Sequence, residues 1–298
     1  MSPLHPVRSR SRIRGSTRVV GLIGWPVEHS VSPAMHNAAF EALGLDWCYV
    51  PLPVRPGHIA EALAGIVALG FGGVNVTVPH KQALVPLVDE LSEAARAIGA
   101  VNTVIVMDGG RTTGHNTDAG GFMRALKALP FDPHGCSALV LGAGGAARAV
   151  VYALATNQVE VTVLNRTPER AEALVEALRG FASARLYAGP LIADRLRKVG
   201  ANVDLVVNTT PLGMWPHIEG SPWPEELPFP AHALLFDLVY NPRETRLMCQ
   251  ARAVGARACN GLDMLVYQGA EAFTSWTGRE APVDVMRDAC LAALQGAA

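Results

Sequence analysis

A glycine turn between a strand and a helix constrains the fold of this chain more than any other local feature. The apolar run Leu139-Val140-Leu141 leads directly into a glycine-rich turn, and residues 145–155 then have helical periodicity. This order fits G-x-G-x-x-A, in which the glycines permit a tight turn and close approach of a pyrophosphate, while small Ala147 allows close helix packing. The flanking strand and helix favour a dinucleotide site over a ligand-free helix start. The residues predicted to hold the pyrophosphate are Gly142, Ala143, Gly144, Gly145 and Ala146.

The residues that follow the next predicted strand indicate which dinucleotide binds. NAD-specific sites place an acidic side chain about 20 residues after the glycine turn, where it accepts hydrogen bonds from the ribose hydroxyls. This chain has Asn165-Arg166-Thr167 there, with Arg170 one helical turn further on. Guanidinium groups pair well with a 2′-phosphate, and no carboxylate is present to repel it. The segment therefore predicts NADP, with solvated surface charges around a helix start as the alternative.

Apolar runs alternate with segments of helical period along two stretches of the chain. At 298 residues the chain exceeds the size at which one core usually keeps growing, so two domains are expected. A composition of 50% hydrophobic residues, 17% charged residues and 29 glycines suits buried strands joined by tight turns. Strands alternating with helices predict an α/β fold of parallel sheets with helices on both faces. The expected strands are 19–23, 47–52, 74–78, 138–141, 161–164, 205–207 and 234–239; the expected helices are 33–43, 57–69, 81 onward, 121–129, 145–155, 168–178, 263–277 and 283–293.

The polar turn at 114–118 marks the predicted crossing between the domains. We assign 118–261 to a Rossmann-type NADP-binding domain with a parallel sheet. Residues 19–117 together with 262–298 form the predicted α/β substrate-binding and catalytic domain, completed by the C-terminal helices. Residues 1–18 are rich in arginine and serine, and no acidic residue occurs before Glu28. They predict a flexible basic arm, with a transit peptide as the alternative.

Charge and composition narrow the classes of partner. A formal net charge of -1 gives no general electrostatic reason to expect nucleic acid or a membrane surface. No apolar run reaches the roughly 18 residues of a membrane span. The 5 cysteines lack a CxxC pair and the 9 histidines lack an HExxH pattern, so we predict no metal, no disulfide framework and a reducing, cytoplasmic location. A small-molecule substrate is the expected partner, and the protein is expected to be a monomer or homodimer.

Polar clusters follow predicted strands of the first domain, where ligands bind in open parallel sheets. Ser30 and Ser32 are separated by one residue, so an extended backbone would aim both hydroxyls at one carboxylate. The alternative is that Ser32, which precedes Pro33, only caps a helix. Asn75 and Thr77 alternate with valines and would face one side of a strand that Pro79 interrupts. These side chains are predicted to face a ligand.

Lys81 and Asp118 are the candidate acid-base pair. Lys81 follows the Asn75 segment and Asp118 opens the turn at the domain crossing, so the two could meet beside the nicotinamide. A ketone that receives hydride needs a proton on its oxygen, which a lysine in a partly dry cleft can supply while an aspartate orients the hydroxyl. A surface lysine and a helix-capping aspartate are the alternative.

The order of these motifs resembles the shikimate dehydrogenase family over about residues 19 to 290. The segments that carry the resemblance are Gly24-Trp25-Pro26, Ser30-Val31-Ser32-Pro33-Ala34-Met35-His36, Asn75-Val76-Thr77-Val78-Pro79-His80-Lys81, Gly99-Ala100-Val101-Asn102-Thr103, Gly114-His115-Asn116-Thr117-Asp118, the glycine turn, Asn165-Arg166-Thr167, Asn208-Thr209-Thr210-Pro211-Leu212-Gly213-Met214 and Gly261-Leu262-Asp263-Met264-Leu265-Val266-Tyr267-Gln268. The resemblance implies reversible reduction of 3-dehydroshikimate to shikimate by NADPH, a step in chorismate and aromatic amino acid biosynthesis. It also implies a two-domain fold that closes over the cleft.

The resemblance further implies a role for each matching residue. Ser30 and Ser32 would bind the substrate carboxylate, Asn75, Thr77, Asn102, Asp118 and Gln268 the ring hydroxyls, and Lys81 would be the acid-base residue coupled to Asp118. Tyr240 would approach the substrate from the cofactor side. The glycine turn would hold the pyrophosphate, Asn165, Arg166, Thr167 and Arg170 the 2′-phosphate, and Leu238, Gly261 and Met264 the nicotinamide end.

Three other functions are compatible with parts of the pattern. A quinate/shikimate dehydrogenase that uses NAD is argued against by Arg166, although His115 occurs in some relatives that accept quinate. A nucleotide-sensing regulator without catalysis would lack Lys81 or Asp118, and both are present. Another two-domain dehydrogenase, such as one acting on folate, is disfavoured by the paired serines and the Asn75 to Lys81 segment.

Overall fold

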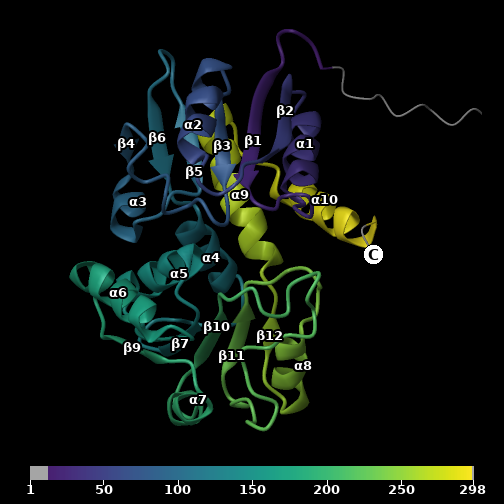
Figure 1. Ribbon diagram of the computed structural model, residues 1–298. Coiled ribbons are helices and arrows are strands. Elements are labelled where there is room, and N and C mark those ends of the chain that lie inside the picture. Colours follow the sequence, from purple (N-terminus) through teal and green to yellow (C-terminus); the bar gives the residue numbers. More distant parts are fainter. Residues whose placement is uncertain (1–12, 297–298) are drawn as a thin grey trace, which may run out of the picture.

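The computed structural model describes residues 13–296, which fold around two six-stranded sheets (Figure 1). The first sheet has strand order β2-β1-β3-β5-β6-β4, and the second has order β12-β11-β10-β7-β8-β9. Figure 1 shows helices beside each sheet, with α4 and α9 running through the region between the sheets. The predicted two-domain α/β fold is confirmed.

The first sheet is mixed, which corrects the prediction of parallel pairing in this half of the chain. β1 pairs in parallel with β2 and β3, whereas β5 is antiparallel to both β3 and β6. Only a five-residue connection, 107–111, joins β5 to β6, and a parallel pair needs a crossover of about a dozen residues or more. The strands are β1 (Arg18–Gly24), β2 (Trp47–Pro53), β3 (Gly73–Val76), β4 (Glu90–Leu91), β5 (Thr103–Val106) and β6 (Thr112–His115).

The helices of the first half are α1 (Ser32–Ala42), α2 (Ile59–Ala68) and α3 (Glu93–Ile98). The helix predicted from Lys81 onward is wrong, because residues 81–87 form successive turns. Pro86 lies within this segment, and a proline inside a helix removes a backbone donor and clashes with the preceding turn. Lys81 is the first residue of these turns, and residues 77–80 connect it to the end of β3.

The second sheet is parallel throughout, as predicted. β7 pairs with β8 and β10, β8 with β9, β10 with β11, and β11 with β12, all in parallel. Two strands, one 3-10 turn and two helices of this half were not predicted: β9 (Leu186–Pro190), β12 (Ala258–Cys259), η1 (Arg179–Phe181), α7 (Ala193–Gly200) and α8 (Arg246–Ala253). The remaining elements are β7 (Ser137–Leu141), α5 (Gly145–Thr156), β8 (Glu160–Asn165), α6 (Pro168–Leu178), β10 (Leu205–Asn208) and β11 (Leu234–Asp237).

The C-terminal helices return to the first sheet, as the sequence predicted. α9 (Leu262–Thr277) and α10 (Val283–Gly296) share a core with β1 and α1, in which Phe40, Phe273 and Met286 are at most 1% exposed. The indole Nε1 of Trp276 also donates to the backbone oxygen of Val104 in β5 at 3.0 Å. α4 (Asp118–Lys127) packs between α9 and α5. The chain therefore crosses twice between the two sheets.

The start of the described chain is attached to the loop before β2. The hydroxyls of Ser16 and Thr17 donate to the Asp46 carboxylate at 2.8 and 2.7 Å, and β1 begins at Arg18. Most of the predicted arm, residues 1–12, lies outside the described residues. Within residues 13–296, no helix is both long and apolar enough to cross a membrane.

A fully buried histidine lies in the core shared by α1 and the C-terminal helices. His36 is 0% exposed, and neither ring nitrogen has a hydrogen-bond partner within residues 13–296. Its ring stacks on Tyr49 with centroids 4.4 Å apart and an interplanar angle of 2°. Burial lowers the pKa of His36 to about 3 because an imidazolium would lose its hydration there. The imidazole is therefore neutral in the folded protein at physiological pH.

His36 is expected to make the fold sensitive to acid. The unfolded chain binds a proton at His36 near pH 6.5, whereas the folded chain does so only near pH 3. The contribution of His36 to the free energy of unfolding is therefore fully present above pH 6.5. It decreases by about 1.4 kcal/mol per pH unit as the pH falls from 6.5 to about 3. The free energy of unfolding, measured with denaturant at pH 7.5 and pH 5.0, should differ by about 2 kcal/mol less in His36→Phe than in the original chain. An equal pH dependence in both proteins would contradict this expectation, and exposed His134→Phe is the control.

Candidate active site

Lys81 and Asp118 form a short ion pair at the start of α4. The ammonium Nζ lies 2.6 Å from Oδ2 of Asp118, and the two side chains are 14% and 7% exposed. Asp118 is the first residue of α4, where the partial positive charge of a helix N-terminus favours a carboxylate. The pair thus places a proton donor and a fixed acceptor side by side in a mostly water-excluded position.

Asn102 holds the other oxygen of Asp118. Its Nδ2 donates to Oδ1 of Asp118 and to the hydroxyl of Thr117, both at 2.9 Å, and its Oδ1 accepts from the Thr117 backbone N–H at 2.8 Å. Oε1 of Gln268, which α9 supplies, lies 3.4 Å from the same Nδ2. Both carboxylate oxygens of Asp118 therefore have a donor, which fixes the orientation of the carboxylate relative to Lys81.

Asn75 supports this network through hydrogen bonds to Asn102 and Thr103. Its Nδ2 donates to the backbone oxygen of Asn102 at 3.2 Å and to the hydroxyl of Thr103 at 3.0 Å, while its Oδ1 accepts from the Tyr49 phenol at 2.9 Å. Both amide donors are thus used within the protein, so Asn75 has only acceptor capacity left for a ligand. The amide positions Asn102 directly.

Thr77 lies beyond the strand that was predicted to contain it. β3 ends at Val76, and the Thr77 N–H donates to the backbone oxygen of Ile23 at 2.8 Å. The strand predicted at 74–78 therefore ends earlier, because the backbone turns before Pro79, which has no N–H for a ladder, and the common face of Asn75 and Thr77 stays a prediction. The Thr77 methyl instead packs over Gly24, so closely that a Cβ on that glycine would clash with it.

The two serines also differ from the predicted extended geometry. Val31 between them has helical dihedrals, φ -86° and ψ -2°, and is the N-cap of α1. Ser32 is therefore the first helical residue rather than the cap, and the Ser30 hydroxyl accepts from its N–H at 3.2 Å. The Ser30 hydroxyl, rather than that of Ser32, therefore binds a backbone N–H at the start of α1. Ser32 is 6% exposed, and Ser30 is more open.

The glycine turn has the backbone that the sequence pattern requires. Gly142 has φ +108°, and a Cβ there would lie 2.6 Å from the Thr209 hydroxyl, so only glycine fits. Gly144 is the exposed N-cap of α5, and a Cβ at that position would have no neighbouring atom within 4 Å, whereas Ala147 is 0% exposed in the core. Ala143, Gly145 and Ala146 are half-buried. The open turn and the helix N-terminus fit a dinucleotide pyrophosphate.

Lys81 lies directly against the glycine turn. A Cβ on Gly145 would be 3.4 Å from Cδ of Lys81 and 3.5 Å from its Cβ. The Arg148 side chain of α5 also donates to the backbone oxygen of Ile98, and the ring of His29 lies 4.0 Å from the ring of Trp215. These contacts join segments beside the first sheet to segments beside the second, so the Lys81–Asp118 pair and the glycine turn share one site.

The residues at the end of β8 leave two guanidinium groups unpaired within the described part of the chain. Arg166 and Arg170 are exposed, and neither side chain makes an ion pair or hydrogen bond with residues 13–296. Nδ2 of Asn165 donates to the backbone oxygen of Thr167 at 2.8 Å, which fixes the turn into α6. Two such cations beside an ordered turn fit a phosphate monoester.

Leu238, Gly261 and Met264 meet at the carboxyl end of β11. Gly261 approaches Leu238 so closely that a Cβ on the glycine would clash with the Leu238 backbone oxygen. Met264 is 6% exposed in the core of the second sheet. Tyr240 packs against the core of the first sheet, and burial raises its pKa to about 12. Its phenol is therefore neutral at physiological pH and can donate a hydrogen bond.

Sequence reasoning missed three polar residues of this region. Asp237, at the end of an apolar run, is 0% exposed and accepts from Asn208, Val239 and Thr245, and burial raises its pKa. A carboxylate that ends a buried strand is a signal that could have been noticed.

Glu271 is the second residue that was missed. Its pKa rises to about 7 through desolvation and the negative charge of Asp118. Its Oε2 occupies space that Gly120 leaves free, 2.6 Å from a Cβ placed there. Tyr49 is the third.

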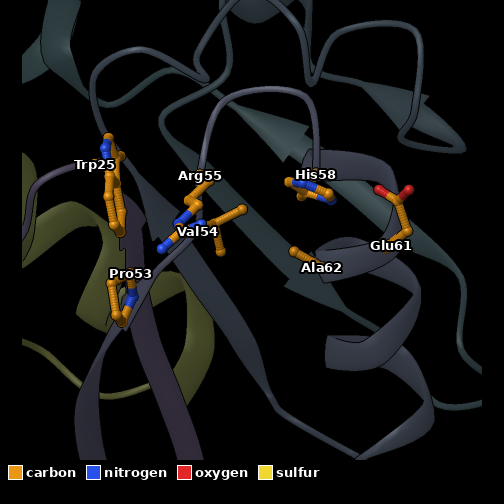
Figure 2. Close-up of a pocket in the computed structure, with 7 residues that line it drawn as sticks. All are labelled: Trp25, Pro53, Val54, Arg55, His58, Glu61 and Ala62. Atoms are coloured by element: carbon orange, nitrogen blue, oxygen red, sulfur yellow. The ribbon is translucent and has the colours of Figure 1, made fainter.

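A separate surface cavity of about 610 Å³ lies on the first half of the chain (Figure 2). Trp25, Arg55 and His58 are among its lining residues, and the Arg55 guanidinium lies 5.5 Å from the centre of the Trp25 ring. None of the predicted catalytic or binding residues lines it. The cavity is therefore distinct from the Lys81 site.

Family models match most of the chain. A shikimate dehydrogenase substrate binding domain model matches residues 22–104, a shikimate / quinate 5-dehydrogenase model matches 124–211, and a shikimate 5′-dehydrogenase C-terminal domain model matches 261–291. The three matched segments include Lys81, the glycine turn and Gln268 respectively.

Individual proteins are similar over nearly their whole length. The shikimate dehydrogenase (NADP(+)) of Moorella thermoacetica is 51% identical, covering 92% of this chain and 93% of that protein. The shikimate 5-dehydrogenase of Thermus thermophilus, solved with NADP(H) and shikimate, has 42% identity and a TM-score of 0.82, covering 93% of this chain and 100% of the other. The quinate dehydrogenase of Corynebacterium glutamicum, solved with NAD, has 36% identity and a TM-score of 0.82, covering 93% and 99%.

Proposed function

This chain belongs to the shikimate dehydrogenase family, and on that premise we propose that it catalyses the reversible NADPH-dependent reduction of 3-dehydroshikimate to shikimate. It is an NADP-dependent oxidoreductase that acts in aromatic amino acid biosynthesis through chorismate. The observation that carries this proposal is the Lys81–Asp118 pair at 2.6 Å, held by Asn102 and lying against the glycine turn.

The acid-base step is assigned to Lys81. In the reducing direction its ammonium donates a proton to the ketone oxygen, which becomes a hydroxyl, and in the oxidising direction the neutral amine accepts that proton. Asp118 keeps Lys81 in place and accepts a hydrogen bond from a substrate hydroxyl. Because both oxygens of Asp118 are already held, this orientation needs no rearrangement during the reaction.

The substrate is held by polar groups around this pair. Ser30 and Ser32 bind its carboxylate, and Thr77, Asn102 and Gln268 bind its ring hydroxyls. Asn75 contributes through Asn102, whose backbone oxygen it holds. The Tyr240 phenol donates from the side of the second sheet. Closely spaced donors and acceptors on rigid elements favour one orientation of a polyhydroxylated ring.

The cofactor site consists of residues from the second sheet. Bound NADPH supplies the hydride. The open Gly144 turn and the N-terminus of α5 hold the pyrophosphate, Arg166 and Arg170 hold the 2′-phosphate with Asn165 and Thr167 shaping the turn, and Leu238, Gly261 and Met264 contact the nicotinamide end. The backbones of Gly261 and Leu238 lie in close contact there.

The domain boundaries and the cellular setting are part of the same proposal. We assign 19–117 with 262–298 to the substrate domain and 118–261 to the NADP domain, supported by the separate sheets and by the packing of α9 and α10 on the first. A cytoplasmic location fits the scattered cysteines, none of which forms a disulfide within residues 13–296, and a monomer or homodimer is the proposed assembly.

A spectrophotometric assay that crosses shikimate and quinate with NADP and NAD tests this function. The highest kcat/KM is expected for shikimate with NADP, because Arg166 and Arg170 are available to pair with the 2′-phosphate. Quinate with NAD as the best pair would favour the quinate dehydrogenase alternative, and His115 would then be the residue to replace. Absence of activity with all four combinations would disprove the proposed function.

A further inference from the structure

Tyr49 is a buried polar residue that the mechanism above does not use. It lies on β2, is 2% exposed, and its phenol donates to Oδ1 of Asn75 at 2.9 Å. Burial raises its pKa well above the ordinary value, and the nearby hydroxyl of Ser32 acts in the opposite direction. The phenol therefore lies near Ser32, which is predicted to bind the substrate carboxylate, and is bonded to Asn75, which holds Asn102 and through it Asp118.

Helix α1 fixes the position of Tyr49 in two ways. The side chain of Asn37 bonds both backbone groups of Tyr49, donating to its oxygen at 2.9 Å and accepting from its N–H at 2.8 Å. The His36 ring stacks flat on the phenol ring at 4.4 Å. Since α1 begins at Ser32, the same helix carries the predicted carboxylate ligand and the residues that hold Tyr49.

From Tyr49 a continuous set of hydrogen bonds leads to the acid-base pair. Asn75 accepts from the phenol and donates to the Asn102 backbone oxygen and the Thr103 hydroxyl. The Asn102 side chain then donates to Asp118, which accepts from Lys81. Because the Nδ2 donors of Asn75 are directed to Asn102 and Thr103, its Oδ1 faces Tyr49, and the phenol donates to that oxygen.

We propose that Tyr49 is a positioning residue that couples the carboxylate-binding segment at Ser32 to the hydroxyl-binding network at Asn102, acting through Asn75. This inference rests on the proposed function. Without the phenol hydroxyl, Oδ1 of Asn75 is a buried acceptor that has lost its donor, and the amide can rotate to find another. Rotation would remove its donors from Asn102 and Thr103, so the groups that face the substrate would lose their fixed spacing.

The test is Tyr49→Phe in the full-length chain. We expect the KM for shikimate, and its Kd measured by calorimetry, to rise about tenfold, while the Kd for NADP changes less than about twofold, because only the substrate side of the site is affected. Tyr152→Phe is the matched control, since that partly buried tyrosine makes no hydrogen bond through its hydroxyl within the described residues and lies on α5. Tyr152→Phe should leave the KM and Kd for shikimate and the Kd for NADP unchanged.

A double-mutant cycle tests the route through Asn75. In an Asn75→Ala background, Tyr49→Phe should add less than about a twofold change in the Kd for shikimate, because the acceptor that the phenol holds is absent. Fully additive effects, equal losses for shikimate and NADP, or an unchanged Kd in the single variant would each overturn the inference. These results remain distinct from failure of the proposed function, in which the original chain would neither bind nor oxidise shikimate.

Discussion

Replacement of Lys81 by alanine should lower kcat for shikimate oxidation by about 10²- to 10⁴-fold while the Kd for shikimate changes little. The reason is that a proton-transfer group acts mainly in the transition state, where the hydroxyl proton is leaving. In the structure the Lys81 side chain is 14% exposed and its ammonium is bonded to Asp118, so bulk water cannot easily replace it. Single-turnover absorbance of NADPH separates this step from binding and release, and calorimetry gives the Kd.

Lys127→Ala is the matched control for this variant. Lys127 lies at the end of α4, is exposed and makes no ion pair within the described residues, so its loss should leave kcat unchanged. Asp118→Asn should also reduce kcat, because the carboxylate no longer holds Lys81. If Lys81→Ala kept the original turnover, Lys81 would be removed from the mechanism and the ion pair would be structural.

Replacement of Arg166 by alanine should weaken NADP by about 10- to 100-fold and NAD by less than about twofold. The 2′-phosphate is the only chemical difference between the two cofactors at this end of the molecule. Arg166 is exposed and makes no ion pair within residues 13–296, so no partner there would compete with the phosphate or lose a contact on substitution. Fluorescence titration with each cofactor measures the two affinities without requiring turnover.

The control for Arg166 is Arg179→Ala, which removes an exposed arginine of the same half that pairs with Glu176 at 3.0 Å. It should leave both affinities unchanged. Equal losses for NADP and NAD in Arg166→Ala would show that Arg166 does not recognise the phosphate. Arg170→Ala would then be the next variant, since Arg170 lies one helical turn further along α6.

Local patterns determined the features whose physics is local. The glycine turn was predictable because positive φ at Gly142 and a small residue at Ala147 are demands that adjacent residues impose. Strands and helices alternate from β7 to β10, so the parallel pairing of those strands also followed from the order of elements. The helix expected at Lys81 failed where Pro86 overrode the hydrophobic period.

Side-chain geometry at the site was less accessible to sequence reasoning. Paired serines suggested an extended segment, but Val31 is helical because the Ser30 hydroxyl satisfies the first donor of α1. Asn75 was predicted from its sequence neighbours to face a ligand, yet both N–H groups of its amide donate to Asn102 and Thr103. A single strand pattern cannot show which partners a polar side chain finds on the adjacent strand.

The sequence by itself determined a nucleotide turn, the arginines beside it and the residue types needed to protonate a ketone. Only the tertiary structure decided which of them meet. Lys81 and Asp118 are 37 positions apart and Asn102 and Gln268 are 166 apart, and these pairs come together because α4 and α9 run between two sheets whose order no local pattern specifies. The role proposed for Tyr49 also depends on the tertiary structure, because its buried hydroxyl donates to Asn75, which is 26 positions away in the sequence.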